Sequence, residues 1–468
     1  MKNVEPAVNM AARAAPARPA LARTALALLP LQIGFRGAEA AWPLLLAAWF
    51  GHTPATDLYF LCAAVYVFAG ALLAGAFQDS ALTPVLLEVR HRDPAQLPRV
   101  AGAVLGHTLV GAVIVAVVTG ALAAAGFALF CRGPLLPLAL TFAPSFSLYL
   151  VAVALRGFHV GLLNALGRFA AHPVASGLGM AGTIALIALT RSRLGVAVVP
   201  VALLGGELVA VFLLAAMTRR CLKVRLVPSL RRPEPVRRLF SLLGYEVAGN
   251  TVTRINPVVD QIMAGFSPLA GAGTMLRFAA DVASLPNSLL QATLFPALLS
   301  RLSLEGAAGR REEFRATLGR SLFGVCTILT VTSALLIAVR APLFRLLFLH
   351  GEMDPDGVRR MVEIAPYALV GVPPFGALLV LARAHVALQN GRIMLPIGIF
   401  NAAVNALLDL ALYPLLGLGG ILLATSLVHT AIAAALWVCL RPLLVSARSS
   451  GAPQARAGAS PAACSLPR

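Results

Sequence analysis

Residues 100–131 read VAGAVLGHTLVGAVIVAVVTGALAAAGFALFC and contain no Asp, Glu, Lys or Arg. An α-helix rises about 1.5 Å per residue, so roughly 20 apolar residues cross the ~30 Å hydrocarbon core of a bilayer. A stretch this long and this apolar has no polar face to turn toward water. It predicts a membrane-spanning helix, with residues to spare for tilt or for a surface extension.

The rest of the chain has the same character. Apolar residues make up 59% of the 468 residues, charged residues make up 12%, and the mean hydropathy is +0.84. A soluble domain is about 45–50% apolar and about 25% charged, so a soluble fold could not cover this apolar surplus. Further candidate spans fall near 27–50, 57–77, 134–155, 173–190, 194–216, 239–264, 272–298, 321–340, 362–388, 393–415 and 418–440. We predict an all-α, polytopic membrane protein with about 12 transmembrane helices.

The formal net charge of +19 comes mostly from arginines between the apolar stretches. No nucleic-acid-binding motif accompanies them, so we expect no nucleic-acid partner. Cytoplasmic loops of membrane proteins are enriched in Lys and Arg. With a cytoplasmic N-terminus, the connections expected inside carry Arg90, Arg92, Arg99, Arg156, Arg168, Arg219, Arg220, Lys223, Arg225, Arg231, Arg232, Arg237, Arg238, Arg301, Arg310, Arg311, Arg315 and Arg320. Despite exceptions such as Arg132, Arg191 and Arg193, this asymmetry predicts that both termini are cytoplasmic.

A basic, proline-containing stretch divides the chain into two parts. We expect a disordered cytoplasmic N-terminus at 1–25, a first six-helix half at 26–217, a basic cytoplasmic linker at 218–238, a second six-helix half at 239–441 and a disordered cytoplasmic tail at 442–468. Transporters are commonly built from two such halves.

The chain lacks the motifs of common enzymes and metal sites. Its six cysteines and eight histidines stand singly, without C-x-x-C, H-x-x-x-H or H-E-x-x-H motifs, and there is no Walker loop. The sequence therefore predicts a transporter that is not an enzyme and that uses no metal or cofactor. Coupling to a Na⁺ or H⁺ gradient, or to the membrane potential, stays open.

Ionisable residues inside apolar stretches are informative, because a charge near the bilayer centre costs at least ~2.5–3.5 kcal/mol. Arg36 and Glu39 lie three positions apart and Arg277 and Asp281 four apart, so each pair can form an ion pair on one helix face. Either pair can be structural or can hold its arginine ready for substrate. Asp57 begins a span, where a carboxylate suits a helix N-terminus.

The stretch 239–264 carries many polar groups, which cannot all face lipid. They include Glu246, Asn250, Thr251, Thr253, Arg254, Asn256, Asp260 and Gln261. The two interpretations are a helix that lines a hydrated cavity and a helix whose polar groups pack tightly against the first span.

Several segments resemble the MurJ/MviN family of lipid II flippases, within the superfamily that includes MATE exporters. The resemblance is carried, in order, by ATDLYF at 55–60, GAF at 75–77, PVL at 84–86, DQIMA at 260–264, FPALLSR at 295–301 and LGGILLATS at 418–426. It covers most of residues 30–440. The family's first-helix arginine aligns with Arg36, whereas other family arginine positions read Trp42, Ala69, Gly70 and Asp281 here.

The resemblance implies an MOP/MATE-like, monomeric carrier in a bacterial inner membrane. It implies alternating access, which turns an undecaprenyl-pyrophosphate-linked saccharide, lipid II or a related precursor, from the inner to the outer leaflet. Arginines in a central cavity would hold the pyrophosphate, because a guanidinium fork matches phosphate geometry. The candidates for this contact are Arg36, Arg254 and Arg277, with Glu39 orienting Arg36, and the candidates for cation coupling are Asp57, Asp260 and Asp281.

Three alternatives accompany this hypothesis. A cation-coupled MATE-like exporter of small amphiphiles would depend on acids and not on arginines. A flippase for O-antigen or exopolysaccharide units would carry a different lipid-linked saccharide. A membrane-bound transferase of polymer assembly would need a catalytic His or Asp near a membrane surface, and the sequence offers no such group of residues.

Overall fold

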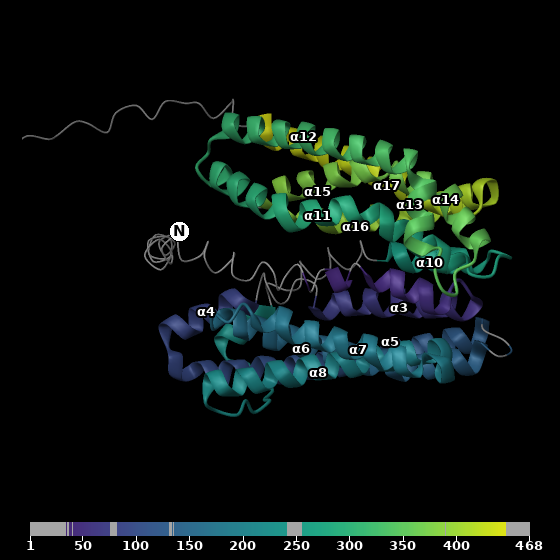
Figure 1. The fold of residues 1–468 in the computed structure, drawn as a ribbon. Coiled ribbons are helices and arrows are strands. Elements are labelled where there is room, and N and C mark those ends of the chain that lie inside the picture. Colours follow the sequence, from purple (N-terminus) through teal and green to yellow (C-terminus); the bar gives the residue numbers. More distant parts are fainter. Residues whose placement is uncertain are drawn as a thin grey trace, which may run out of the picture.

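The computed structural model describes residues 34, 37–39, 41–74, 82–130, 133, 135–240, 255–388 and 390–445, and every structural statement below refers to these residues. Their regular structure is entirely helical. The helices form two lobes, which lie one above the other in Figure 1. The prediction of an all-α protein is confirmed.

The first lobe contains a helical segment at 41–50, followed by six helices of different lengths. These are α3 (Pro54–Ala74), α4 (Thr83–Arg92), α5 (Leu97–Phe130), α6 (Leu135–Ala165), α7 (Ala171–Leu194) and α8 (Val198–Leu222). The second lobe contains α10 (Asn256–Gly265), α11 (Ala272–Ala307), α12 (Arg311–Ala338), α13 (Arg340–Phe348), α14 (Pro355–Leu369), α15 (Val372–Ala387), α16 (Met394–Leu416) and α17 (Leu418–Val445). Short 3₁₀ turns at Pro94–Gln96, Gly195–Ala197 and Gly391–Ile393 join neighbouring helices.

Within the described ranges, seven helical stretches are long and apolar enough to cross a membrane, and nine if each of two bent pairs counts as one span. One of these stretches, 171–222, consists of α7 and α8, which fold back on each other at Gly195. The chain is therefore a multi-pass membrane protein, while the predicted total of twelve spans includes residues outside the described ranges.

The hairpin of α7 and α8 is held by small residues. Gly179 faces Gly206 so closely that a methyl group added to either would overlap backbone of the other helix. The single hydroxyl proton of Thr183 is shared between the Ala202 carbonyl oxygen of α8 and the Gly179 carbonyl oxygen of its own helix, each 3.1 Å from Oγ1. Helices in membranes associate largely through such close packing, because lipid tails are as apolar as the side chains themselves.

The break between α14 and α15 bends the chain by 40° at Gly371, just before Pro373 and Pro374. A break frees backbone carbonyls, and in lipid these need a partner inside the protein. Ser426 Oγ donates to the Tyr367 carbonyl oxygen at 2.6 Å, and Asn287 Nδ2 donates to the Val372 carbonyl oxygen at 3.0 Å. Side chains of α11 and α17 thus stabilise the bend.

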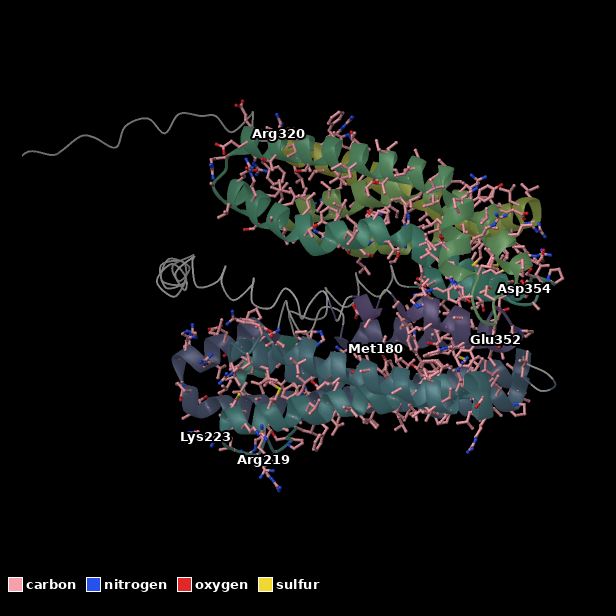
Figure 2. All side chains as sticks on the ribbon, in the orientation of Figure 1. Met180, Arg219, Lys223, Arg320, Glu352 and Asp354 are labelled. Atoms are coloured by element: carbon pink, nitrogen blue, oxygen red, sulfur yellow. The ribbon has the colours of Figure 1, made fainter. Side chains whose placement is uncertain are left out.

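Charged side chains lie at both ends of the molecule, and the end with Glu352 and Asp354 also carries Arg359 and Arg360 of α14. Figure 2 shows Arg219, Lys223 and Arg320 at one end, and Glu352 and Asp354 at the other. After α8 the predicted linker lies against α5, where the Ser229 amide donates to the Gly102 carbonyl oxygen at 3.0 Å. The predicted linker start at 218 lies inside α8, which continues to Leu222.

Gly206→Ala should lower the melting temperature of the purified protein, because the new methyl group would overlap Gly179 and Thr183 of α7. Overpacking of this kind typically costs about 1–3 kcal/mol. Gly205→Ala is the matched control, since no atom lies within 4 Å of the place that its new methyl group would take. Thermal unfolding in detergent compares the two variants; equal melting temperatures would contradict the packing described for this hairpin.

Candidate substrate cavity between the lobes

The lobes meet at the end where α3 and α11 begin. Asp57 of α3 accepts hydrogen bonds from the backbone N–H of Thr274, at 2.7 Å, and from its hydroxyl, at 2.8 Å. The first amides of a helix lack partners within it and carry a partial positive charge. Asp57, a predicted helix-capping residue, therefore caps the N-terminus of a helix in the opposite lobe. Nothing in these contacts tests its predicted role in cation coupling.

A second contact joins the lobes at the same end. The backbone N–H of Glu352 donates to the carbonyl oxygen of Ala48, at 3.0 Å. Gly351 precedes it with φ +61° and sits so close to Ala48 that a side chain would overlap the backbone there. Two independent hydrogen-bonded contacts thus close this end of the interface.

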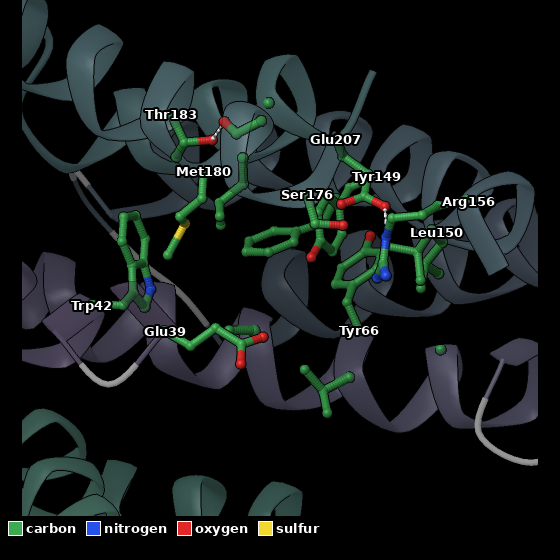
Figure 3. Close-up of a pocket in the computed structure, with 18 of the residues that line it drawn as sticks. Glu39, Trp42, Tyr66, Tyr149, Leu150, Arg156, Ser176, Met180, Thr183 and Glu207 are labelled. Atoms are coloured by element: carbon green, nitrogen blue, oxygen red, sulfur yellow. Dashed lines mark hydrogen bonds and ion pairs between the residues drawn. The ribbon is translucent and has the colours of Figure 1, made fainter. Parts of the chain in front are cut away.

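A cavity of about 600 Å³ lies between the lobes. Its wall includes residues of α3, α6, α7 and α8, some of which are labelled in Figure 3. Arg277 and Asp281 of α11 complete the wall from the second lobe. A second cavity of about 490 Å³ lies among α10, α11, α15 and α17, and it shares Arg277 and Asp281 with the first. These two residues therefore lie where the two cavities adjoin.

Arg277 and Asp281 form the ion pair that their spacing predicted. Arg277 Nε lies 2.9 Å from Asp281 Oδ1, and the two side chains are 44% and 24% exposed. The guanidinium thus faces a cavity, and its charge is neutralised by Asp281 of the same helix. Asp281, a candidate cation carrier, serves as the partner of Arg277 in this arrangement.

An ion pair that the sequence did not predict lies in the first-lobe wall. Arg156 of α6 donates from Nε to Glu207 Oε1 of α8, and both residues line the first cavity. The prediction that Arg156 lies in a cytoplasmic connection is wrong, because α6 continues to Ala165. Glu207 is the only acidic residue of α8. A single carboxylate in an apolar helix is the one feature of the sequence that could have indicated a buried partner.

A buried polar cluster adjoins the second cavity. Asn405 Nδ2 donates both to Asp260 Oδ1, at 3.0 Å, and to Asp409 Oδ2, at 2.9 Å. Thr425 lies beside them, 3.5 Å from Asp260 Oδ2. Asp409 is fully buried, and its Oδ1 has no hydrogen-bond partner among the described residues. Two carboxylates around one amide leave an unsatisfied acceptor, which suits a bound proton or cation.

The polar groups at the start of α10 pair with α16. Asn256 and Asn401 exchange hydrogen bonds of 3.3 Å, and Gln261 Nε2 donates to the Gly273 carbonyl oxygen at 3.1 Å. Asn256, Asp260 and Gln261 also line the second cavity. In the described part of this stretch, polar groups thus both line a cavity and pack against α16 and α11, whereas Glu246, Asn250, Thr251, Thr253 and Arg254 lie outside the described residues.

Two predicted head-group contacts, Arg36 and Arg254, lie outside the described residues. Glu39 lines the first cavity, and Trp42 lies beside it. The described ionisable groups of this cavity are Glu39, Arg156, His172, Glu207, Arg277 and Asp281. Cations and carboxylates are therefore mixed in its wall, and among described residues each arginine has an acidic partner.

Two helical lobes around a shared, charge-lined cavity thus form a multi-pass membrane protein. The chain belongs to the family described as lipid II flippase MurJ, whose sequence profile matches residues 46–453. The resemblance found in the sequence is thereby confirmed.

Two curated relatives carry the description "Probable lipid II flippase MurJ". That of Bdellovibrio bacteriovorus is 25% identical over 276 residues, which is 58% of this chain and 52% of the relative. That of Rhizobium meliloti is 26% identical over 288 residues, which is 60% of this chain and 53% of the relative. The chain thus matches about half the length of these relatives.

Solved structures show the same fold. A lipid II flippase MurJ in an inward closed conformation has a TM-score of 0.74 at 16% identity, covering 89% of this chain and 87% of that one. An inward-facing multidrug resistance MATE transporter of the MOP superfamily has a TM-score of 0.68 at 15% identity, covering 90% and 96%. The predicted MOP/MATE-like fold is confirmed.

Asp57→Ala should loosen the contact between the lobes. Hydrogen bonds to a charged group contribute about 1.5–3 kcal/mol, so amide exchange at the start of α11 should accelerate by about tenfold or more. Hydrogen-exchange mass spectrometry of peptides that contain Thr274 measures this. Asp356→Ala removes an exposed carboxylate of α14 and serves as the control. Unchanged exchange at Thr274 in Asp57→Ala would show that the cap does not hold the lobes together.

Proposed function

We propose that this protein moves an undecaprenyl-pyrophosphate-linked saccharide, lipid II or a related envelope precursor, from the inner to the outer leaflet by alternating access. The observation that carries this proposal is the inter-lobe cavity, closed at one end and lined by ionised groups from both lobes. Such a cavity gives a charged head group a polar environment at membrane depth, while the lipid tail stays in the bilayer. The proposal includes no catalytic step.

The charge distribution supports an orientation for this carrier. The basic end of the molecule, with Arg219, Lys223 and Arg320, suits the cytoplasm of a bacterial cell and its inner membrane. The end closed by Asp57 and Thr274 then faces the periplasm, and both termini are cytoplasmic. In this orientation the cavity receives its substrate from the inner leaflet.

Arg277 is our first candidate for contact with the pyrophosphate, because it lies where the two cavities adjoin. Arg36 and Arg254 are proposed as further contacts on the sequence alone, with Glu39 as the group that orients Arg36. Guanidinium groups suit this role, since they offer paired N–H donors that match phosphate oxygens.

Cation coupling is proposed at the cluster of Asp260, Asn405, Asp409 and Thr425. Its carboxylate, amide and hydroxyl oxygens are the hard donors that small cations prefer, and its unsatisfied carboxylate oxygen is equally suited to a proton. Among the three predicted coupling acids, Asp260 is the one whose contacts support the role, since Asp281 is paired with Arg277 and Asp57 caps α11.

Complementation tests the proposed function. Expression of this chain should rescue bacteria depleted of their own lipid II flippase, and Arg277→Gln should reduce lipid II translocation by about tenfold or more, because a charge-assisted phosphate contact is lost. Arg359→Gln, which removes an arginine from an exposed ion-pair cluster on α14, is the control and should rescue fully. Translocation is measured as lipid II accessible on the outer leaflet.

Failure of the unaltered chain to rescue would exclude lipid II as the substrate and favour O-antigen or exopolysaccharide units. Complementation of cells that lack the corresponding flippases then tests those substrates. Transport of organic cations in vesicles, dependent on acids and indifferent to Arg277→Gln, would instead establish the exporter alternative.

Asp260→Asn should remove the dependence of transport on a cation gradient. In proteoliposomes the unaltered protein should work faster under an imposed Na⁺ or H⁺ gradient, whereas the variant should not respond, because the cluster loses a carboxylate ligand. Asp356→Asn provides the matched control on an exposed surface. A response to the gradient that survives in Asp260→Asn would rule out the cluster as the coupling site.

A further inference from the structure

Two described arginines, one from each lobe, line the same cavity, and each is held by one carboxylate. In the second lobe Arg277 and Asp281 belong to one helix. In the first lobe the partners come from two helices, with Arg156 on α6 and Glu207 on α8 (Figure 3). The first-lobe pair therefore depends on tertiary packing, and it places a second guanidinium in the wall of the cavity of about 600 Å³ that Arg277 also lines.

The pair with Glu207 uses only part of the guanidinium. The hydrogen bond comes from Arg156 Nε, and the two Nη nitrogens donate to no described residue. An arginine carries five N–H donors in a fixed plane, so four remain for a ligand in the cavity. The Arg156 and Glu207 side chains are 23% and 12% exposed, and that exposure is toward the cavity that they line.

An arginine in a cavity of this kind needs a partner when no substrate is bound, because an unpaired, desolvated charge costs several kcal/mol. A carboxylate is a replaceable partner. The pyrophosphate of a lipid-linked saccharide is negatively charged on both of its phosphates, whereas a carboxylate carries a single charge, and a phosphate can engage the guanidinium fork through two parallel hydrogen bonds. Phosphate can therefore take the place of Glu207 once substrate enters.

We propose that Arg156 binds a phosphate of the lipid-linked head group, and that Glu207 is a positioning residue that holds Arg156 in the empty cavity and yields it to the phosphate. This inference rests on the proposed function. With Arg277 it gives the pyrophosphate one arginine from each lobe, so that the head group keeps a partner as the lobes move relative to each other. The class of ligand is a polyprenyl pyrophosphate.

Binding of undecaprenyl pyrophosphate to the full-length protein in nanodiscs tests the proposal. Undecaprenol lacks the phosphates, and inorganic pyrophosphate lacks the lipid, so these two probes separate the contributions of each part. The variants are Arg156→Gln, Arg156→Lys, Glu207→Gln and the double variant Arg156→Gln/Glu207→Gln. Arg359→Gln is the matched control, and melting temperatures verify that each variant folds.

We expect Arg156→Gln to weaken binding of undecaprenyl pyrophosphate by about tenfold or more, and Arg156→Lys to weaken it less, because a lysine keeps the charge without the fork. Glu207→Gln should strengthen binding severalfold, since the competing carboxylate is gone. The double variant should bind as weakly as Arg156→Gln. Undecaprenol should bind equally to all variants.

A purely structural ion pair gives the opposite pattern. Glu207→Gln would then weaken binding as much as Arg156→Gln does, and the double variant would recover, because both buried charges are removed together. That pattern, or binding unaffected by Arg156→Gln, would overturn this site and leave the proposed function standing. If inorganic pyrophosphate binds as tightly as undecaprenyl pyrophosphate, the proposal that the ligand is a lipid head group would be overturned. No binding by the unaltered protein would overturn the proposed function and this site together.

Discussion

Inside the hydrocarbon layer no water replaces a lost hydrogen-bond partner, and the polar groups of the described helices are arranged around that constraint. Arg156 meets Glu207, Arg277 meets Asp281, and Asp260 meets Asn405. The two partnerships that join different helices, Arg156 with Glu207 and Asp260 with Asn405, fix which helix faces must adjoin. The same partnerships gather the ionised groups around shared cavities, since a charge can persist at membrane depth only in such surroundings. The residues that give one another hydrogen-bond partners are therefore the same residues to which we assign substrate binding and cation coupling.

The two lobes differ in how they hold together. In the first lobe, α7 and α8 approach until backbone touches backbone at Gly179 and Gly206, and such an interface leaves little room for adjustment. In the second, the break at Gly371 interrupts a span, and side chains of neighbouring helices hold the freed carbonyls. A carrier that changes shape by moving one lobe against the other needs units that stay intact during the motion. Under the proposed alternating access, these contacts would keep both lobes intact while the interface changes.

Much of the fold was predictable, because span length and apolar character follow from bilayer thickness. The bend before α15 and the pairing of Arg277 with Asp281 were predictable too, since both follow from local sequence. Contacts between helices distant in sequence were not. Nothing at position 156 identifies Glu207 as its partner, and an arginine near the end of an apolar stretch reads equally well as a loop residue. The sharing of Asn405 by Asp260 and Asp409 likewise depends on the packing of α10 against α16.

The cap formed by Asp57 differs from the ion pairs that line the cavity in where it lies, at a helix start near the molecular end. If the lobes part there, the carboxylate and the amide become hydrated, and the free-energy cost is only the difference between two hydrogen-bonded states, about 0.5–3 kcal/mol. Removing one partner from a buried ion pair costs about 3–5 kcal/mol. Under the proposed alternating access, solvation of this carboxylate and amide would therefore set much of the cost of opening this edge of the protein.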